Sequence, residues 1–98
     1  MIDIQQTETF AEWLKQLRDR RAAARIAERL RRLALGNPGD VKSVGQGLSE
    51  LRIDYGPGYR VYFVMHGATL VIVLCGGDKA DQDRDIARAK ALAKEIGR

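Results

Sequence analysis

The stretch LSELRIDYGPGYRVYFVMHGATLVIVL, residues 48–74, decides the fold. Apolar and polar side chains alternate in its first part, which is typical of a strand with one buried face. Its last part is continuously apolar, as in a central strand of a sheet. The predicted strands and the turns that join them are Leu48 to Tyr55, Gly56-Pro57-Gly58, Tyr59 to His66, Gly67-Ala68 and Leu70 to Leu74. Gly76-Gly77 is expected to end the last of these strands, and the short turns predict an antiparallel meander.

The residues before this meander predict a short edge strand, two helices and a weak strand. Residues 2–6 form the edge strand, and Thr7 or Thr9 caps a first helix that runs to about Leu17. Asp19 caps a second helix, rich in Ala, Arg and Leu, from about Arg21 to Leu35. The weak strand is Ser43-Val44, after the breaker at residues 36–40.

A last helix is expected from about Ala80 to Ile96, where it either packs on the sheet or projects toward a partner. The order β-α-α-β-β-β-β-α predicts an α+β fold, with two N-terminal helices packed on a small, mainly antiparallel sheet. The residues expected to form one core between those helices and the sheet are Trp13, Leu17, Ile26, Leu30, Leu51, Ile53, Val61, Phe63, Ile72 and Leu74.

Length and composition exclude several classes of protein. The 98 residues predict one domain, residues 1–98, and an apolar content of 45% is too high for a disordered chain. No apolar run is long enough for a transmembrane helix, and the first residues do not resemble a signal peptide. One cysteine excludes an internal disulfide and fits a reducing cytoplasm. With a single histidine besides, neither a metal site nor a cofactor is expected.

The net charge of +4 favours an acidic partner, either nucleic acid or protein. Residues 7–35 hold eight basic and four acidic side chains, which account for the whole excess. Arg25, Arg29 and Arg32 follow one another at helical spacing and share one face of the second helix. That face is either a solvated helix surface or a ridge that binds a nucleic-acid backbone.

The hairpin predicts a polar sheet face opposite the helix-covered one. With Tyr55 opposite Tyr59, Arg52 lies opposite Tyr62, and Asp54 lies opposite Arg60. One interpretation is a solvated face with cross-strand ion pairs. The other is a phosphate-binding surface, because arginine can hold two phosphate oxygens at once. The further side chains placed at this face are Glu50, Lys42 and Lys79.

The order of motifs resembles the RelE/ParE toxin superfamily of bacterial toxin–antitoxin systems, and within it the HigB-like branch of phage Gp49-related killer proteins. The resemblance covers nearly the whole chain. The motifs that carry it are Phe10-x-x-Trp13-Leu14, Arg25-Ile26-x-x-Arg29-Leu30, Gly36-Asn37-x-Gly39-Asp40-x-Lys42, Glu50-Leu51-Arg52-Ile53, Gly58-Tyr59-Arg60-Val61-Tyr62-Phe63 and Gly76-Gly77-Asp78-Lys79-x-x-Gln82-x-x-Asp85-Ile86.

This resemblance implies a cytoplasmic, ribosome-dependent mRNA endonuclease that works without a metal, through attack of the RNA 2′-OH on the adjacent phosphate. It also implies a helix-turn-helix antitoxin that binds the toxin as a hetero-oligomer, and the ribosome and mRNA as further partners. The catalytic residues implied are Arg60, Arg52, Lys79, Glu50 and Tyr62, and the RNA-binding residues are Lys42, Arg25, Arg29 and Arg32.

The chain departs from the best-known members of the superfamily at one place. They carry a Tyr or His after the last strand as general acid or base, where this chain has residues 78–82, Asp-Lys-Ala-Asp-Gln. Lys79 and Tyr62 are then the candidate acids. The departure leaves two alternatives open: a ParE-like inhibitor of DNA gyrase, and an RNA-binding module without catalysis.

Overall fold

A computed structural model describes residues 1–97 of the protein. Its elements are β1 (Asp3–Gln6), α1 (Glu8–Gln16), α2 (Arg20–Ala34), β2 (Val41–Ser43), β3 (Leu48–Ile53), β4 (Tyr59–His66), β5 (Leu70–Asp78), the short 3-10 helix η1 (Lys79–Asp81) and α3 (Gln82–Glu95). The five strands form one sheet in the order β1-β5-β4-β3-β2, in which β1 runs parallel to β5 and the other pairs are antiparallel. The predicted α+β class and the edge position of β1 are confirmed. Within residues 1–97, no helix is long and apolar enough to cross a membrane.

Two polar side chains start the N-terminal helices. Thr7 accepts a hydrogen bond from the backbone N–H of Phe10, so it is Thr7 and not Thr9 that caps α1. Asp19 caps α2 as predicted, because its carboxylate accepts from the N–H groups of Arg21 and Ala22. These caps satisfy backbone donors that have no partner inside a helix.

The first core lies between α1, α2 and one face of the sheet. Phe10, Ile26 and Phe63 are buried there, and Phe63 is only 4% exposed, as its predicted position requires. Trp13, Leu17 and Leu30 are partly buried against the same cluster. The core prediction is wrong for Ile72 and Leu74, which belong to a cluster on the opposite face.

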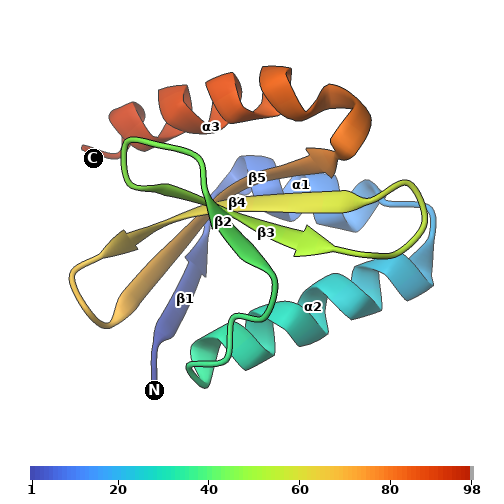
Figure 1. Ribbon diagram of the computed structural model, residues 1–98, viewed down its shortest axis with the longest axis horizontal. Helices are drawn as coiled ribbons and strands as arrows, with labels where there is room; N and C mark the ends of the chain where they lie inside the picture. The colour runs from blue at the N-terminus through green and yellow to red at the C-terminus, as the bar shows by residue number, and fades with distance from the viewer. Residues whose placement is uncertain (98) are drawn as a thin grey trace.

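Helix α3 covers that opposite face, so the sheet is enclosed on both sides (Figure 1). The second cluster buries Leu48, Val64 and Ala89 together with the polar residue Tyr62. The prediction of an open, solvated sheet face is therefore wrong in this region. Apolar residues of α3 such as Ala89 recur at helical spacing and meet the second sheet face, where their burial stabilises the docked helix.

The β3–β4 hairpin has a different register from the predicted one. Ile53 pairs with Tyr59, so Arg52 lies opposite Arg60 and Glu50 lies opposite Tyr62. The connecting loop is longer than expected because Gly56 and Gly58 both adopt positive φ and the strand stops at Ile53. The difference is an even number of residues, so each side chain keeps its predicted face.

Strand β5 does not end at Gly76-Gly77 but continues to Asp78. The register with β4 shifts between Tyr62 and Phe63, and this bulge leaves Gly76 against α1 and Gly77 against α3. A Cβ on Gly76 would lie 2.5 Å from the Trp13 ring, and one on Gly77 would collide with the Asp85 carboxylate. The two glycines thus do not end β5. They allow α1 and α3 to approach its two faces closely.

Candidate functional site

An open cleft of about 180 Å³ lies where the β3–β4 hairpin meets the end of β5. It brings together all three predicted catalytic cations, since Arg52, Arg60 and Lys79 line it. The rest of the lining is Asp40, Asp54 and Gly58. The register of the hairpin sets the first two cations directly opposite each other, and such like-charge neighbours repel unless a carboxylate offsets them.

Gly58 allows the third cation to reach the arginines. The N–H of Lys79 donates to the Gly58 carbonyl at 2.9 Å, which holds the end of β5 against the hairpin loop. A Cβ on Gly58 would lie 3.1 Å from the Lys79 side chain and 3.5 Å from Nη1 of Arg60. Gly58 also has a φ of +83°, which other residues rarely adopt. Glycine at this position therefore serves both the turn and the convergence of the two cations.

Glu50 lies beneath the cleft and is fully buried. Its Oε2 accepts a hydrogen bond from the Tyr62 hydroxyl at 3.1 Å and another from Gln82 Nε2 at 2.7 Å. Its Oε1 lies 3.9 Å from Nε of Arg52 and 3.9 Å from Nε of Arg60. At that distance the arginines pair with Glu50 by charge rather than by hydrogen bonds. The predicted pairing of Arg60 with Asp54 is replaced by this buried pairing with Glu50.

Two predicted site residues have less access to solvent than expected. Arg60 is 8% exposed, so only part of its side chain reaches the cleft, whereas Arg52 is half-buried. Tyr62 is fully buried, and burial together with the Glu50 charge raises the pKa of its hydroxyl. The hydroxyl therefore stays protonated and donates to Glu50. In this conformation Tyr62 does not reach a substrate in the cleft.

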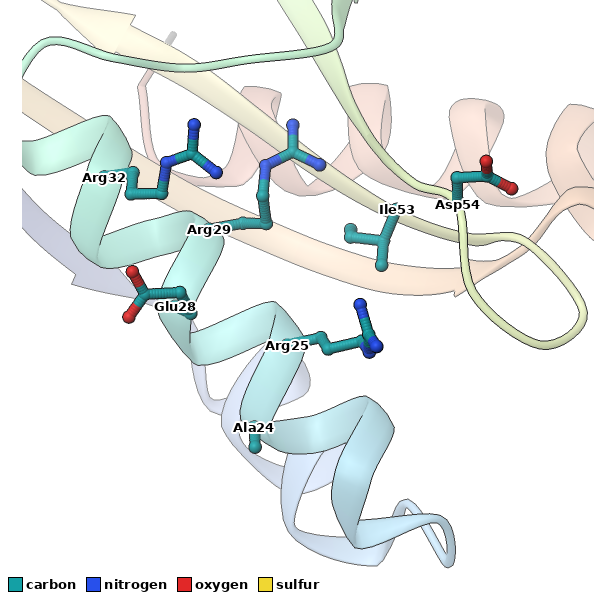
Figure 2. A pocket seen from close by; sticks show the side chains of 7 residues that line it. All are labelled: Ala24, Arg25, Glu28, Arg29, Arg32, Ile53 and Asp54. Atoms are coloured by element: carbon teal, nitrogen blue, oxygen red, sulfur yellow. The ribbon is translucent and has the colours of Figure 1, made fainter.

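A second cavity of about 520 Å³ lies along α2 (Figure 2). Arg29 and Arg32 point from the helix to the same side, and Arg25 lies over the Tyr55 ring at 4.6 Å. Asp54 lines both this cavity and the cleft, so the two adjoin. The structure thus brings the predicted basic ridge next to the cationic cleft.

Arg29 is a structural member of that ridge. Its guanidinium donates to the carbonyls of Arg52 at 2.6 Å, Pro38 at 2.9 Å and Asp40 at 3.2 Å. Burial lowers its pKa, although an arginine remains charged under all ordinary conditions. These contacts hold the loop before β2 against α2, and they place Asp40 at the cleft.

Lys42 lies on the same sheet face as the cleft but is not among the described residues that line the cleft. It is exposed on β2 and pairs in register with Glu50. Sequence reasoning missed Asp40, Gly58 and Gln82 as members of the site. Each of them stands inside a motif quoted above, but their spacing alone does not show that a loop, a turn and a helix start meet at one place.

The chain is thus a small basic α+β protein with a cationic cleft at one end of an enclosed sheet. A family model for phage-derived Gp49-like proteins (DUF891) matches residues 12–96, and the chain belongs to this family. The family is associated with toxin–antitoxin systems, so membership suggests the toxin role for this chain and implies an antitoxin partner. The chain is also 55% identical over 96 residues to an uncharacterized protein of Haemophilus influenzae, covering 98% of this chain and 97% of that one.

Proposed function

We propose that this toxin is a HigB-like member of the RelE/ParE superfamily and that it cleaves mRNA on the ribosome. The observation that carries the proposal is the cleft, in which Arg52, Arg60 and Lys79 converge at an open surface. Three cations around one small cavity suit a phosphate whose charge increases during the reaction. The open cleft leaves room for a chain passing through, as an RNA strand requires.

The proposed reaction is an internal transfer at phosphorus. The 2′-oxygen of one nucleotide attacks the adjacent phosphate, the bond from phosphorus to the 5′-oxygen breaks, and a 2′,3′-cyclic phosphate and a 5′-hydroxyl result. The 2′-hydroxyl loses its proton to a carboxylate of the cleft, Asp40 or Asp54, and the 5′-oxygen gains one from the Lys79 ammonium. Arg60 and Arg52 stabilise the charge on the phosphate oxygens, and the step uses no metal or other cofactor.

Glu50 and Tyr62 support this reaction from beneath the cleft. Glu50 offsets the repulsion between the two arginines, and Tyr62 holds its carboxylate in place. Flanking RNA phosphates lie along α2, where Arg25 and Arg32 line the adjoining cavity, and Lys42 lies at the same sheet face. Arg29 contributes by holding the loop that carries Asp40.

The decisive experiment is induced expression of Arg60→Ala, followed by growth measurement and mapping of mRNA 5′ ends. We expect the wild-type protein to arrest growth and to produce codon-linked cuts with 5′-hydroxyl ends. Loss of one group that stabilises the transition state typically lowers the rate ~10²–10³-fold, so the variant should lose both effects. Arg18→Ala removes the same charge from an exposed position outside the cleft and should behave as wild type.

Two outcomes would replace the proposal. Stalled gyrase–DNA complexes without mRNA cuts, and a toxic Arg60→Ala variant, would indicate a ParE-like target. RNA binding without cleavage or growth arrest would indicate a binding module. If the adjacent reading frame encodes a helix-turn-helix antitoxin, its coexpression should restore growth.

A further inference from the structure

One hydrogen bond links the start of α3 to the buried Glu50 carboxylate beneath the cleft, among the interactions of residues 1–97. Gln82 is the first residue of α3, and its Nε2 donates to Glu50 Oε2 at 2.7 Å. The contact joins residues 32 positions apart in the sequence and two different elements, β3 and α3. It is shorter than the 3.1 Å contact that the Tyr62 hydroxyl makes with the same oxygen.

The two oxygens of Glu50 have different neighbours. Oε2 accepts the two neutral donors, Gln82 and Tyr62. Oε1 faces Nε of both arginines and makes no hydrogen bond with residues 1–97, and neither do those two Nε atoms. The direction of Oε1 therefore depends on how the donors hold Oε2, because a glutamate carboxylate turns easily about its last bond.

We propose that Gln82 is a positioning residue of the cleft. By donating to Glu50 it fixes the plane of the carboxylate, and the carboxylate in turn sets Arg52 and Arg60 side by side at the phosphate position. The inference rests on the proposed function for its effect on cleavage, but the positioning itself can be measured without any reaction. Without Gln82, the carboxylate keeps only the longer contact from Tyr62, which holds Oε2 less firmly.

The position of Gln82 depends on how α3 docks. The helix is held by the second core, where Ala89 is fully buried, and the Asp85 carboxylate lies against Gly77. A shift of α3 along the sheet would move Gln82 away from Glu50. The helix that covers the sheet is thereby also the element that orders the cationic cleft at its end.

The test compares Gln82→Leu with Gln16→Leu. Gln16 makes the same kind of contact, an amide that donates to Glu12 at 3.1 Å, but on the exposed surface of α1. We expect Gln82→Leu to lower kcat for RNA cleavage between about 10-fold and 100-fold with KM nearly unchanged, as for a group displaced by about 1 Å. Gln16→Leu should cleave as wild type.

The second readout is the NMR signal of the Arg60 Nε–H group, assigned by its loss in Arg60→Lys. In the wild-type protein we expect it away from the signals of exposed arginines, because Arg60 is enclosed beside Glu50. It should move toward those signals in Gln82→Leu and not in Gln16→Leu. A lower kcat with an unmoved Arg60 signal would overturn the inference, and so would wild-type cleavage by Gln82→Leu.

A third variant covers the case in which Gln82→Leu does not fold. Gln82→Glu places a second carboxyl beside Glu50, and the adjacent negative charge raises the pKa of the introduced carboxyl. When protonated, the new carboxyl donates to Oε2 as the amide does. The groups that face Glu50 are Lys42 from β2, Arg52 from β3, Arg60 and Tyr62 from β4, and Gln82 from α3. The RNA-cleavage activity of Gln82→Glu, relative to that of the wild-type protein, should therefore rise as the pH falls. A ratio of the two activities that does not change with pH would overturn the inference.

The outcomes separate this inference from the proposed function. If the wild-type protein does not cleave RNA, the proposed function fails and the Arg60 signal decides the inference alone. Movement of that signal in Gln82→Leu then supports positioning, and its absence overturns it. If the wild-type protein cleaves RNA, both readouts apply.

Discussion

Replacing Gly76 with alanine tests how closely α1 approaches the end of β5. The added Cβ would lie 2.5, 2.6 and 2.8 Å from three atoms of the Trp13 ring, against an optimum of about 3.5–4.0 Å between carbon atoms. The ring is held between Phe10, at 5.8 Å between ring centroids, and Tyr59, at 6.2 Å. Either the ring or the strand must therefore move by about 1 Å, and such overpacking typically costs ~1–3 kcal/mol.

Thermal unfolding followed by circular dichroism measures this cost. For a chain of this size each kcal/mol lowers the Tm by roughly 4–8 °C. The backbone at Gly76 is not at positive φ, so the whole effect should come from the ring. In a Trp13→Leu background the same substitution should therefore cost much less, which a double-mutant cycle reports. An equal loss in both backgrounds, or a wild-type Tm for Gly76→Ala, would show that the Trp13 ring does not limit the side chain at this position.

Two further predictions concern side chains that are bound or buried. Arg29→Lys keeps the charge but not the three hydrogen bonds to carbonyls. We expect it to lower the free energy of unfolding, measured by urea titration, by about 1.5–3 kcal/mol. Unchanged stability would mean that the loop before β2 does not need these contacts. Burial raises the pKa of Asp85, with the Arg84 charge opposing it. A raised folded-state pKa means that the contribution of this group to stability is complete at pH values below its unfolded pKa and is lost as the pH rises through the folded one. Asp85→Asn should therefore be at least as stable as wild type at neutral pH and should remove that part of the pH dependence of Tm; a large loss of stability at neutral pH would contradict the burial argument.

The local patterns were sufficient for the elements and for the faces of β3 and β4, although not for Ile72 and Leu74 of β5. Strand β4 runs from Tyr59 to His66 as predicted, because its turns and its β-rich composition mark both ends. The hairpin register was wrong by two residues, yet Arg52, Arg60, Glu50 and Tyr62 still share one face, because side chains alternate with a period of two. The candidate cations could be found in this way, since charge and alternation are local properties.

Local sequence patterns therefore establish the elements, the sheet faces of β3 and β4, and the family resemblance, whereas Ile72 and Leu74 of β5 were assigned to the wrong face. Which polar groups are buried depends instead on how the elements pack against one another. The docking of α3 encloses Glu50 and Tyr62, and it brings Gln82 into a hydrogen bond with Glu50 from 32 residues away. The bulge in β5 and the approach of Trp13 explain why Gly76 continues a strand that a glycine pair was expected to end. Such contacts depend on how separate elements pack in the folded core. Residue spacing along the chain does not give the distances between those elements.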